Sequence, residues 1–173
     1  MNGTEPENKN KTIRLEEASR LFPAYLKALD ETGCITVPVS GTSMNPFLGH
    51  RRDTVTLVSA EGKKLGPGDI VLYKRSGSGL EAYIMHRIVG IKNGAYVLCG
   101  DAQTRREFGV DRKSILAVAI EAARKGKTIK NTSPVWLFYK HVWRILRPFR
   151  PALLRVFGKK RRASGKTHKG MRA

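Results

Sequence analysis

The chain has 173 residues, and 40% of them are hydrophobic, which is enough for one domain of ordinary size with tails. The formal net charge is +19, and the excess lies at the C-terminal end: residues 122–173 contain 16 Lys and Arg and no Asp or Glu. Such a segment favours contact with nucleic acid, anionic lipid or an acidic partner. No run of about 18 uncharged apolar residues occurs, so we predict no transmembrane helix, and residues 1–12 lack the apolar centre of a secretory signal.

The N-terminal part predicts a short disordered segment followed by a helix. Residues 1–12 are polar and charged, so we expect them to be disordered. Apolar residues then recur three and four apart, as on one face of a helix, and Gly33 is well placed to end it. These residues are Leu15, Ala18, Phe22, Tyr25, Leu26 and Leu29. Pro23 should kink or restart this helix, which we expect to pack on the following domain.

Residues 34 to about 130 show the pattern of short strands separated by glycine-rich turns. The expected strands are 34–39, 54–58, 69–73, 83–91, 96–99, 115–120 and 127–129. Many short strands indicate a mainly β fold: an antiparallel domain over residues 13–130, barrel-like or folded over on itself. Cys34 and Cys99 lie inside these runs, and we expect two buried, reduced thiols, although an exported chain could join them in a disulfide.

The C-terminal part predicts a basic amphipathic helix and a tail. Ser133 as a cap and Pro134 at the first position indicate a helix start, and we assign residues 131–157 to a helical arm. Its apolar face includes Trp136 and Trp143, flanked by Lys and Arg, a composition that suits an anionic lipid headgroup region. A helix packed on the β domain and a contact with nucleic acid are the alternatives. Residues 158–173 should form a disordered basic tail.

Ser43 is a candidate nucleophile. It follows an apolar strand, with Gly41 before it and Pro46 after it, where a hydroxyl can be both exposed and held. An ordinary turn explains the same string. A serine nucleophile needs a base, and the four histidines His50, His86, His141 and His168 are the candidates.

His86 is distinguished from the other histidines by its place in an apolar strand. Asn93-Gly94 is the signal of a two-residue hairpin turn, and counting back from it places His86 opposite Asp101 on the paired strand. This register predicts a base together with a carboxylate that orients it. A purely structural role for a strand histidine is the alternative.

Four stretches resemble the conserved boxes of type I signal peptidases. Residues 41–48 (Gly-Thr-Ser-Met-Asn-Pro-Phe-Leu) resemble the serine box, and residues 68–71 (Gly-Asp-Ile-Val) the second box. Residues 83–90 (Tyr-Ile-Met-His-Arg-Ile-Val-Gly) resemble the strand that bears the base, and Gly100-Asp101 the start of the last box. The four stand in the family's order between about residues 36 and 120. Histidine in place of the usual bacterial lysine is the pattern of the endoplasmic-reticulum and sporulation types, and the superfamily also includes self-cleaving repressors of the SOS response.

The resemblance implies a serine endopeptidase that cleaves a peptide or protein precursor. Ser43 would be the nucleophile, His86 the base and Asp101 its orienting carboxylate, with no metal and no cofactor. Residues expected to bind the oxyanion or the substrate are Gly41, Thr42, Met44 and Pro46. Two departures from the family are the absence of an N-terminal membrane anchor and the segment 102–106 in place of an Asn-rich continuation.

The expected location is the cytoplasm or the surface of the cytoplasmic membrane, reached through the C-terminal arm. Two competing functions stay open. One is a cytosolic protease that matures a peptide precursor, which the missing anchor favours. The other is a non-catalytic or self-cleaving repressor-like protein that binds nucleic acid through its tail.

Overall fold

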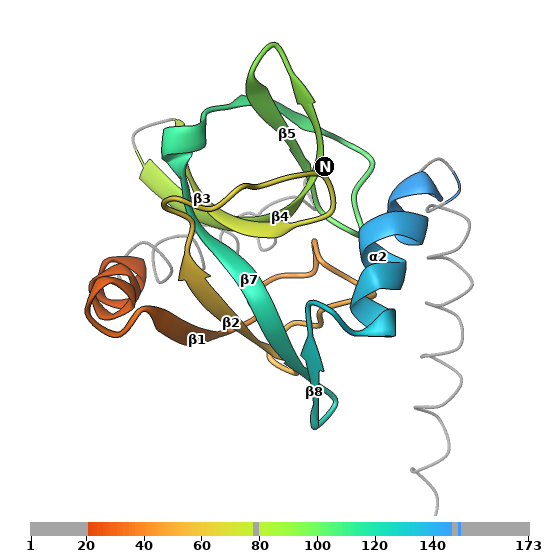
Figure 1. Cartoon of the computed structure of the whole chain (residues 1–173), viewed down its shortest axis with the longest axis horizontal. Coiled ribbons are helices and arrows are strands. Elements are labelled where there is room, and N and C mark those ends of the chain that lie inside the picture. Colours follow the sequence, from red (N-terminus) through yellow and green to blue (C-terminus); the bar gives the residue numbers. More distant parts are fainter. Residues whose placement is uncertain (1–20, 78–79, 147–148, 150–173) are drawn as a thin grey trace, which may run out of the picture.

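The structure is a computed structural model that describes residues 21–77, 80–146 and 149. The predictions for residues 1–12, for the first part of the N-terminal helix, for the arm at 147–148 and 150–157 and for the tail 158–173 lie outside this range. Residues 21–32 are helical and lead directly into the sheet (Figure 1). The helix ends where Gly33 takes a positive φ of 76° and donates its N–H to the carbonyl of Leu29.

Eight antiparallel strands form the body of the molecule. They are β1 (Cys34–Pro38), β2 (Thr54–Ser59), β3 (Ile70–Gly77), β4 (Leu80–Lys92), β5 (Ala95–Cys99), β6 (Glu107–Val110), β7 (Ile115–Arg124) and β8 (Lys127–Lys130). The strand order is β1-β2-β7-β3-β4-β5-β6, and β8 pairs with β7. A 3₁₀ turn, η1 (Arg112–Ser114), precedes β7, and α2 (Pro134–Ile145) follows β8.

The prediction of a mainly antiparallel β fold with a helix at each end is confirmed. The described strands do not close into a barrel, because the path runs from β1 to β6 and these two end strands do not pair with each other. The sheet is curved (Figure 1). Its buried apolar side chains form two clusters. One cluster joins β1 and β2 to α2, and the other lies on the opposite face of β3 and β4.

Alternation of side chains along β1 and β2 explains how the first cluster forms. Ile35 and Val37 on β1 and Val55 and Leu57 on β2 point inward, and the residues between them point outward. Cys34 is one of the outward residues and is exposed, whereas Cys99 is buried, and both are free thiols. The expectation of two buried thiols was therefore wrong for Cys34, since the strand alternation turns its side chain toward solvent.

Helix α2 is packed on the sheet. Ser133 caps it by accepting the N–H of Trp136, and Pro134 occupies the first turn, as the sequence predicted. Trp136 and Trp143 are only 2% and 3% exposed, so both tryptophans face the protein and not a lipid surface. The Trp136 ring meets the ring of Phe47 edge-on, with the centroids 5.2 Å apart. In the described part of the chain, no helix has the length and apolar character needed to cross a membrane.

Replacing Trp136 by Ala should lower the free energy of unfolding by about 3–5 kcal/mol, because a large buried ring is lost and a cavity stays behind. Leu137, the next residue, is 40% exposed, and Leu137→Ala is the matched control. The control should cost about 1 kcal/mol or less. Urea denaturation of the two variants measures the difference. Equal losses in both would show that α2 is not docked through its tryptophan face.

Candidate active site

The serine turn, residues 40–48, is anchored by buried residues after Ser43 and by a hydrogen bond before it. Met44, Phe47 and Leu48 are buried, whereas Ser43 itself is half-buried and Thr42 is exposed. Gly41 has a φ of 85°, a conformation that favours glycine, and its N–H donates to Nδ1 of His50 at 3.0 Å. His50 is half-buried and holds the start of the turn.

The residues predicted to bind the oxyanion or the substrate all lie in this turn, but most of their polar groups are bonded within the protein. The carbonyl of Thr42 accepts the N–H of Asn45 at 3.1 Å, and the carbonyl of Pro46 accepts a 3.2 Å hydrogen bond from Arg124. The side chain of Met44 is 2% exposed and packs in the core. The amide of Gly41 is occupied by His50, so it is not free to stabilise an oxyanion.

The serine turn rests directly on the turn that follows β5. The carbonyl of Ser43 accepts the N–H of Ala102 at 2.7 Å. A side chain at Gly100 would lie 2.6 Å from that same carbonyl, a distance that leaves no room for one. Glycine is therefore required at position 100, and the first and last of the four boxes form one contact.

Asp101 is fully buried and is paired with Arg87. Its two carboxylate oxygens accept from Nε and a terminal nitrogen of Arg87 at 2.9 and 2.7 Å. Arg87 is also fully buried, and it donates its other terminal nitrogen to the carbonyl of Gly68 at 2.8 Å. Trp143 of α2 donates its indole N–H to the carbonyl of Asp101 at 3.0 Å. This bidentate pair thus joins β4 to the turns at Gly68 and Gly100 and to α2.

The pairing of Asp101 with Arg87 corrects the predicted hairpin register. Ile91 faces Tyr96 and Lys92 faces Ala95, as the Asn93-Gly94 turn requires, but a bulge at Val89 then shifts the pairing by one residue. Arg87 faces Cys99, so Asp101, two residues further on, lies on the face of Arg87 and not on that of His86. A one-residue shift moves every side chain to the other face of the sheet. Asp101 therefore does not orient His86.

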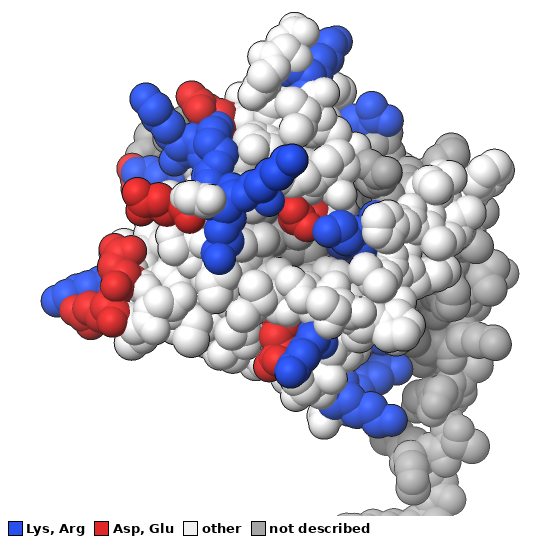
Figure 2. Space-filling model, in the orientation of Figure 1, with Lys and Arg blue, Asp and Glu red and all other residues white. Residues whose placement is uncertain are grey.

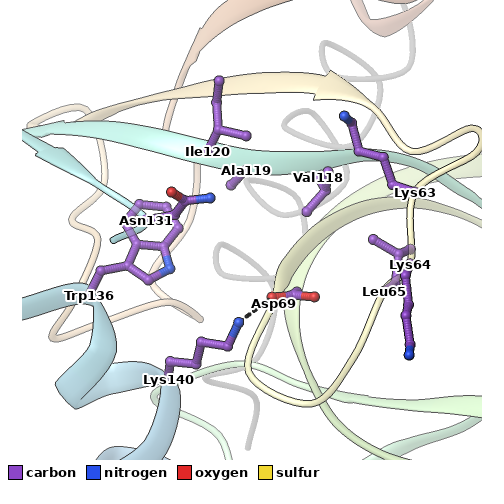
Figure 3. Close-up of a pocket in the computed structure, with 10 residues that line it drawn as sticks. All are labelled: Lys63, Lys64, Leu65, Asp69, Val118, Ala119, Ile120, Asn131, Trp136 and Lys140. Atoms are coloured by element: carbon purple, nitrogen blue, oxygen red, sulfur yellow. Dashed lines mark hydrogen bonds and ion pairs between the residues drawn. The ribbon is translucent and has the colours of Figure 1, made fainter. Parts of the chain in front are cut away.

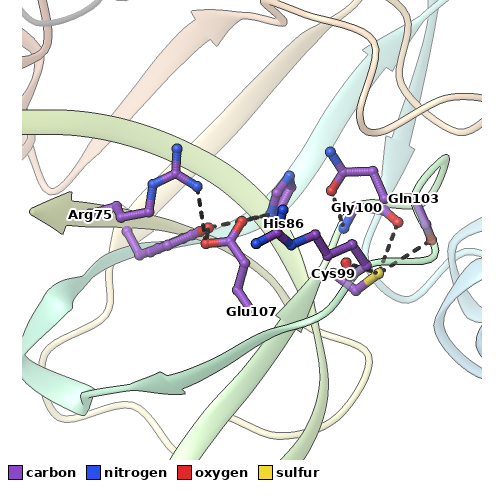
Figure 4. Close-up of polar contacts among 8 residues, drawn as sticks. Arg75, His86, Cys99, Gly100, Gln103 and Glu107 are labelled. Atoms are coloured by element: carbon purple, nitrogen blue, oxygen red, sulfur yellow. Dashed lines mark hydrogen bonds and ion pairs between the residues drawn. The ribbon is translucent and has the colours of Figure 1, made fainter. Parts of the chain in front are cut away.

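The carboxylate beside His86 belongs to Glu107, on β6. Nδ1 of His86 lies 3.3 Å from Oε1 of Glu107, and the hydroxyl of Tyr73 donates to Oε2 of Glu107 at 2.6 Å. The strand register explains this contact: Glu107 faces Leu98 on β5, which faces Ile88 on β4, and Ile88 shares its face with His86. Figure 4 shows the Glu107 carboxylate between Arg75 and His86.

Two partners hold the His86 ring in place. Nδ1 lies 3.3 Å from both the Glu107 carboxylate and the Tyr73 hydroxyl. A proton on Nδ1 would be donated to Glu107, because an ionised carboxylate only accepts hydrogen bonds, and Nε2 would then carry the lone pair. The His86 side chain is 4% exposed, so its ring is largely shielded from water. An imidazole fixed in this way through Nδ1 has the geometry that a general base requires.

Glu107 keeps its negative charge over a wide pH range. The hydrogen bond from His86 lowers the pKa of Glu107 most, helped by Tyr73 and Arg75 and opposed by partial burial, with a result of about 2. Burial and the negative charge of Glu107 raise the pKa of Tyr73, so its hydroxyl stays protonated as a donor. Arg75 approaches the same carboxylate at 3.4 Å.

Segment 102–106 connects Asp101 to Glu107, and the thiol of Cys99 contacts backbone carbonyls within it. The Cys99 thiol lies 3.3 Å from the carbonyls of Gln103 and Arg105, and the Gly100 N–H contacts the side chain of Gln103 (Figure 4). The segment therefore runs as a compact loop from buried Asp101 to Glu107. Its position sets the distance between the serine turn at one end and the histidine partner at the other.

Ser43 and His86 are brought to neighbouring backbone segments. The Ser43 carbonyl bonds to Ala102, Gly100 follows Cys99, and Cys99 pairs with Arg87, the residue after His86. In the described part of the chain, the Ser43 hydroxyl makes no hydrogen bond to His86. Catalytic hydrogen bonds in proteins without substrate are often long and tighten only when substrate is bound.

A cavity of about 330 Å³ lies elsewhere, between α2, β7 and the loop before β3 (Figure 3). Lys140 and Asp69 meet across it at 2.9 Å. Its lining includes neither Ser43, His86 nor Glu107, so we do not place the chemistry there. Among the described residues, no group of three or more His, Cys, Asp or Glu side chains is gathered in a way that could hold a metal ion.

Comparisons with protein-family models, with curated proteins and with solved structures gave no match. The resemblance to signal peptidases therefore depends on the four sequence boxes and stays a prediction. Glu107 and Tyr73 were missed by the sequence analysis. Glu107 is the only acidic residue between Asp101 and Asp111, which is a signal that a search for carboxylates near the β5 hairpin could have used.

Replacing Asp101 by Ala should destabilise the fold by about 3–5 kcal/mol, because it leaves the Arg87 charge buried without a partner. The double variant Arg87→Met/Asp101→Leu removes both charges and should cost less than Asp101→Ala alone. Asp30→Ala, at an exposed position, is the control. Urea denaturation tests the order, and a double variant less stable than the single one would contradict a buried ion pair.

The lowered pKa of Glu107 predicts a pH-dependent contribution to stability. Because the folded pKa is about 2 and the ordinary value is 4.5, the ionised carboxylate stabilises the fold fully above pH 4.5. This contribution is lost as the pH falls from 4.5 toward 2. The difference in unfolding free energy between wild type and Glu107→Gln should therefore shrink over that window in urea denaturation.

Tyr73→Phe provides the matched control for this pH dependence. It removes one donor to Glu107, so the same Glu107→Gln difference, measured in the Tyr73→Phe background, should change less with pH. A difference that stays constant from pH 5 to pH 2 in both backgrounds would show that Glu107 is not held by His86 and Tyr73.

Proposed function

We propose that this protein is a serine endopeptidase that cleaves a peptide or protein precursor, with Ser43 as nucleophile and His86 as base. The observation that supports it most is the contact between buried His86 and the half-buried Glu107 carboxylate, since a catalytic histidine is oriented by such a carboxylate. The four signal-peptidase-like boxes add support. The finer fold assignment, a signal-peptidase-type β domain, is part of the same proposal.

In the proposed reaction, substrate binding brings the Ser43 hydroxyl to Nε2 of His86, which takes the hydroxyl proton as the oxygen attacks the substrate carbonyl. Glu107 holds the imidazole and stabilises the imidazolium that forms. The amide of Ser43, which has no hydrogen-bond partner among the described residues, is the proposed donor to the oxyanion. His86 then passes the proton to the leaving amine, and water hydrolyses the acyl-enzyme.

The role of the acidic residues differs from the one expected from sequence. Glu107 replaces Asp101 as the orienting carboxylate in this proposal, and Asp101 supports the serine turn from below through Arg87 and Ala102. The two acids therefore predict different mutant behaviour. Loss of Glu107 should slow catalysis with a modest effect on folding, whereas loss of Asp101 should unfold the site.

The test is cleavage of a mixed peptide library by purified protein, analysed by mass spectrometry. Ser43→Ala should abolish every cleavage, and Ser40→Ala, an exposed serine of the same turn, should leave the cleavage pattern unchanged. Glu107→Gln should reduce kcat by about 10²- to 10⁴-fold. Arg75→Gln, which alters a neighbour of the same carboxylate but not the base, should reduce it far less.

Cleavage that survives in Ser43→Ala would overturn the serine mechanism. An intact, folded protein with no activity on the library, and without labelling of Ser43 by a fluorophosphonate, would favour the competing non-catalytic function.

A further inference from the structure

The outward face of α2 displays an apolar stripe. Its residues are spaced three and four apart, which places them on one side of the helix. They are Val135, Phe138, Val142 and Ile145, with exposed fractions of 42%, 43%, 41% and 72%. Phe149, beyond the end of α2, is also exposed. A helix on the surface of a domain normally presents polar residues here, and a contiguous apolar patch marks an interaction site.

This stripe is separate from the face that holds α2 on the sheet. Trp136 and Trp143 fill the inward face, so the stripe is not needed for docking of the helix. In Figure 2 the α2 side of the molecule is largely free of charged side chains. The helix thus has two apolar faces: one is buried against the sheet and the other is exposed.

Positive charge precedes and follows the stripe along the chain. Lys125, Lys127 and Lys130, at the turn and strand that precede α2, are exposed, and Figure 2 shows basic side chains gathered at this end of the molecule, beside β8. The chain after α2 adds ten Lys and Arg and no Asp or Glu in residues 147–173. The partner of this surface must therefore offer apolar material and negative charge together.

We propose that the outer face of α2 docks on a bilayer that contains anionic lipid, with the helix axis in the plane of the interface. The stripe enters the boundary between headgroups and acyl chains, and the flanking basic residues attract the lipid phosphates. The sequence analysis expected the tryptophans to make this contact. Since they are buried, the residues that enter the lipid are those of the stripe.

Charge also decides between the bilayer and the other occupants. A second copy of the chain, packed stripe to stripe, would bring two strongly basic C-terminal segments together without acidic residues to offset them. Nucleic acid would satisfy the positive charge but would leave the apolar stripe against phosphates and water. An anionic bilayer satisfies both features.

The test is co-sedimentation of the full chain with vesicles. Vesicles of phosphatidylglycerol and phosphatidylcholine should bind the protein at low salt, binding should weaken at high salt, and vesicles of phosphatidylcholine alone should retain little. Ile145→Asp places a charge at the most exposed residue of the stripe and should weaken binding by about tenfold or more. Ile91→Asp makes the same change at an exposed isoleucine of the β4–β5 hairpin and should bind like wild type.

A second readout is tryptophan fluorescence. Because both tryptophans are already buried, their emission should change little when vesicles are added, even where sedimentation shows binding. A large blue shift would mean that α2 leaves the domain and inserts its tryptophan face, which would overturn the proposal. Ser43→Ala should bind vesicles like wild type, so the outcome does not depend on the proposed peptidase activity.

Three further results would overturn the proposal. One is equal binding of wild type and Ile145→Asp to anionic vesicles. Another is a wild-type dimer in sedimentation velocity that Ile145→Asp dissociates, without vesicle binding, which would make the second copy the occupant. The third is tight binding of an oligonucleotide duplex that persists in Ile145→Asp, with no binding to anionic vesicles.

Discussion

The buried ion pair between Arg87 and Asp101 is the constraint on which the rest of the structure depends. Two charges without access to water are tolerated only when they are paired and hydrogen-bonded, and here a further guanidinium N–H bonds to the carbonyl of Gly68. Trp143 of α2 binds the backbone carbonyl of Asp101, so the helix holds the same residue in place. The Arg87 guanidinium also lies 5.6 Å from the centre of the Phe47 ring, so the serine turn packs over the same group.

Two neighbouring residues of β4, His86 and Arg87, have different partners because successive side chains of a strand point to opposite faces. Arg87 pairs with Asp101 and holds the fold, whereas His86, the preceding residue, contacts Tyr73 and Glu107. The strand therefore carries a rigid, charge-paired support next to the proposed base. Ala102 lies in the loop between Asp101 and Glu107. Its N–H donates to the carbonyl of Ser43, so this loop also holds the serine turn.

Local patterns in the sequence predicted most of the β fold and the serine turn, because alternation and glycine-rich turns are properties of a few adjacent residues. The bulge at Val89 was not predictable in this way, since Val89 and Gly90 fit a regular strand equally well. Because of that single extra residue, Asp101 lies on the face of Arg87 and not on the face of His86. Glu107 was missed because β6 has four residues, two of them exposed, and gives no alternation signal.

Helix α2 links the proposed lipid surface to the candidate active site. Trp143 bonds to the carbonyl of Asp101, and Lys140 bonds to Asp69, next to the Gly68 carbonyl that Arg87 holds. The helix is thus attached to both turns that frame the Arg87–Asp101 pair. A bilayer that fixes the outer stripe of α2 would also fix the orientation of the serine turn relative to the membrane plane. A precursor held at the same membrane would then meet Ser43 from a restricted set of directions, which lowers the entropic cost of bringing the two together.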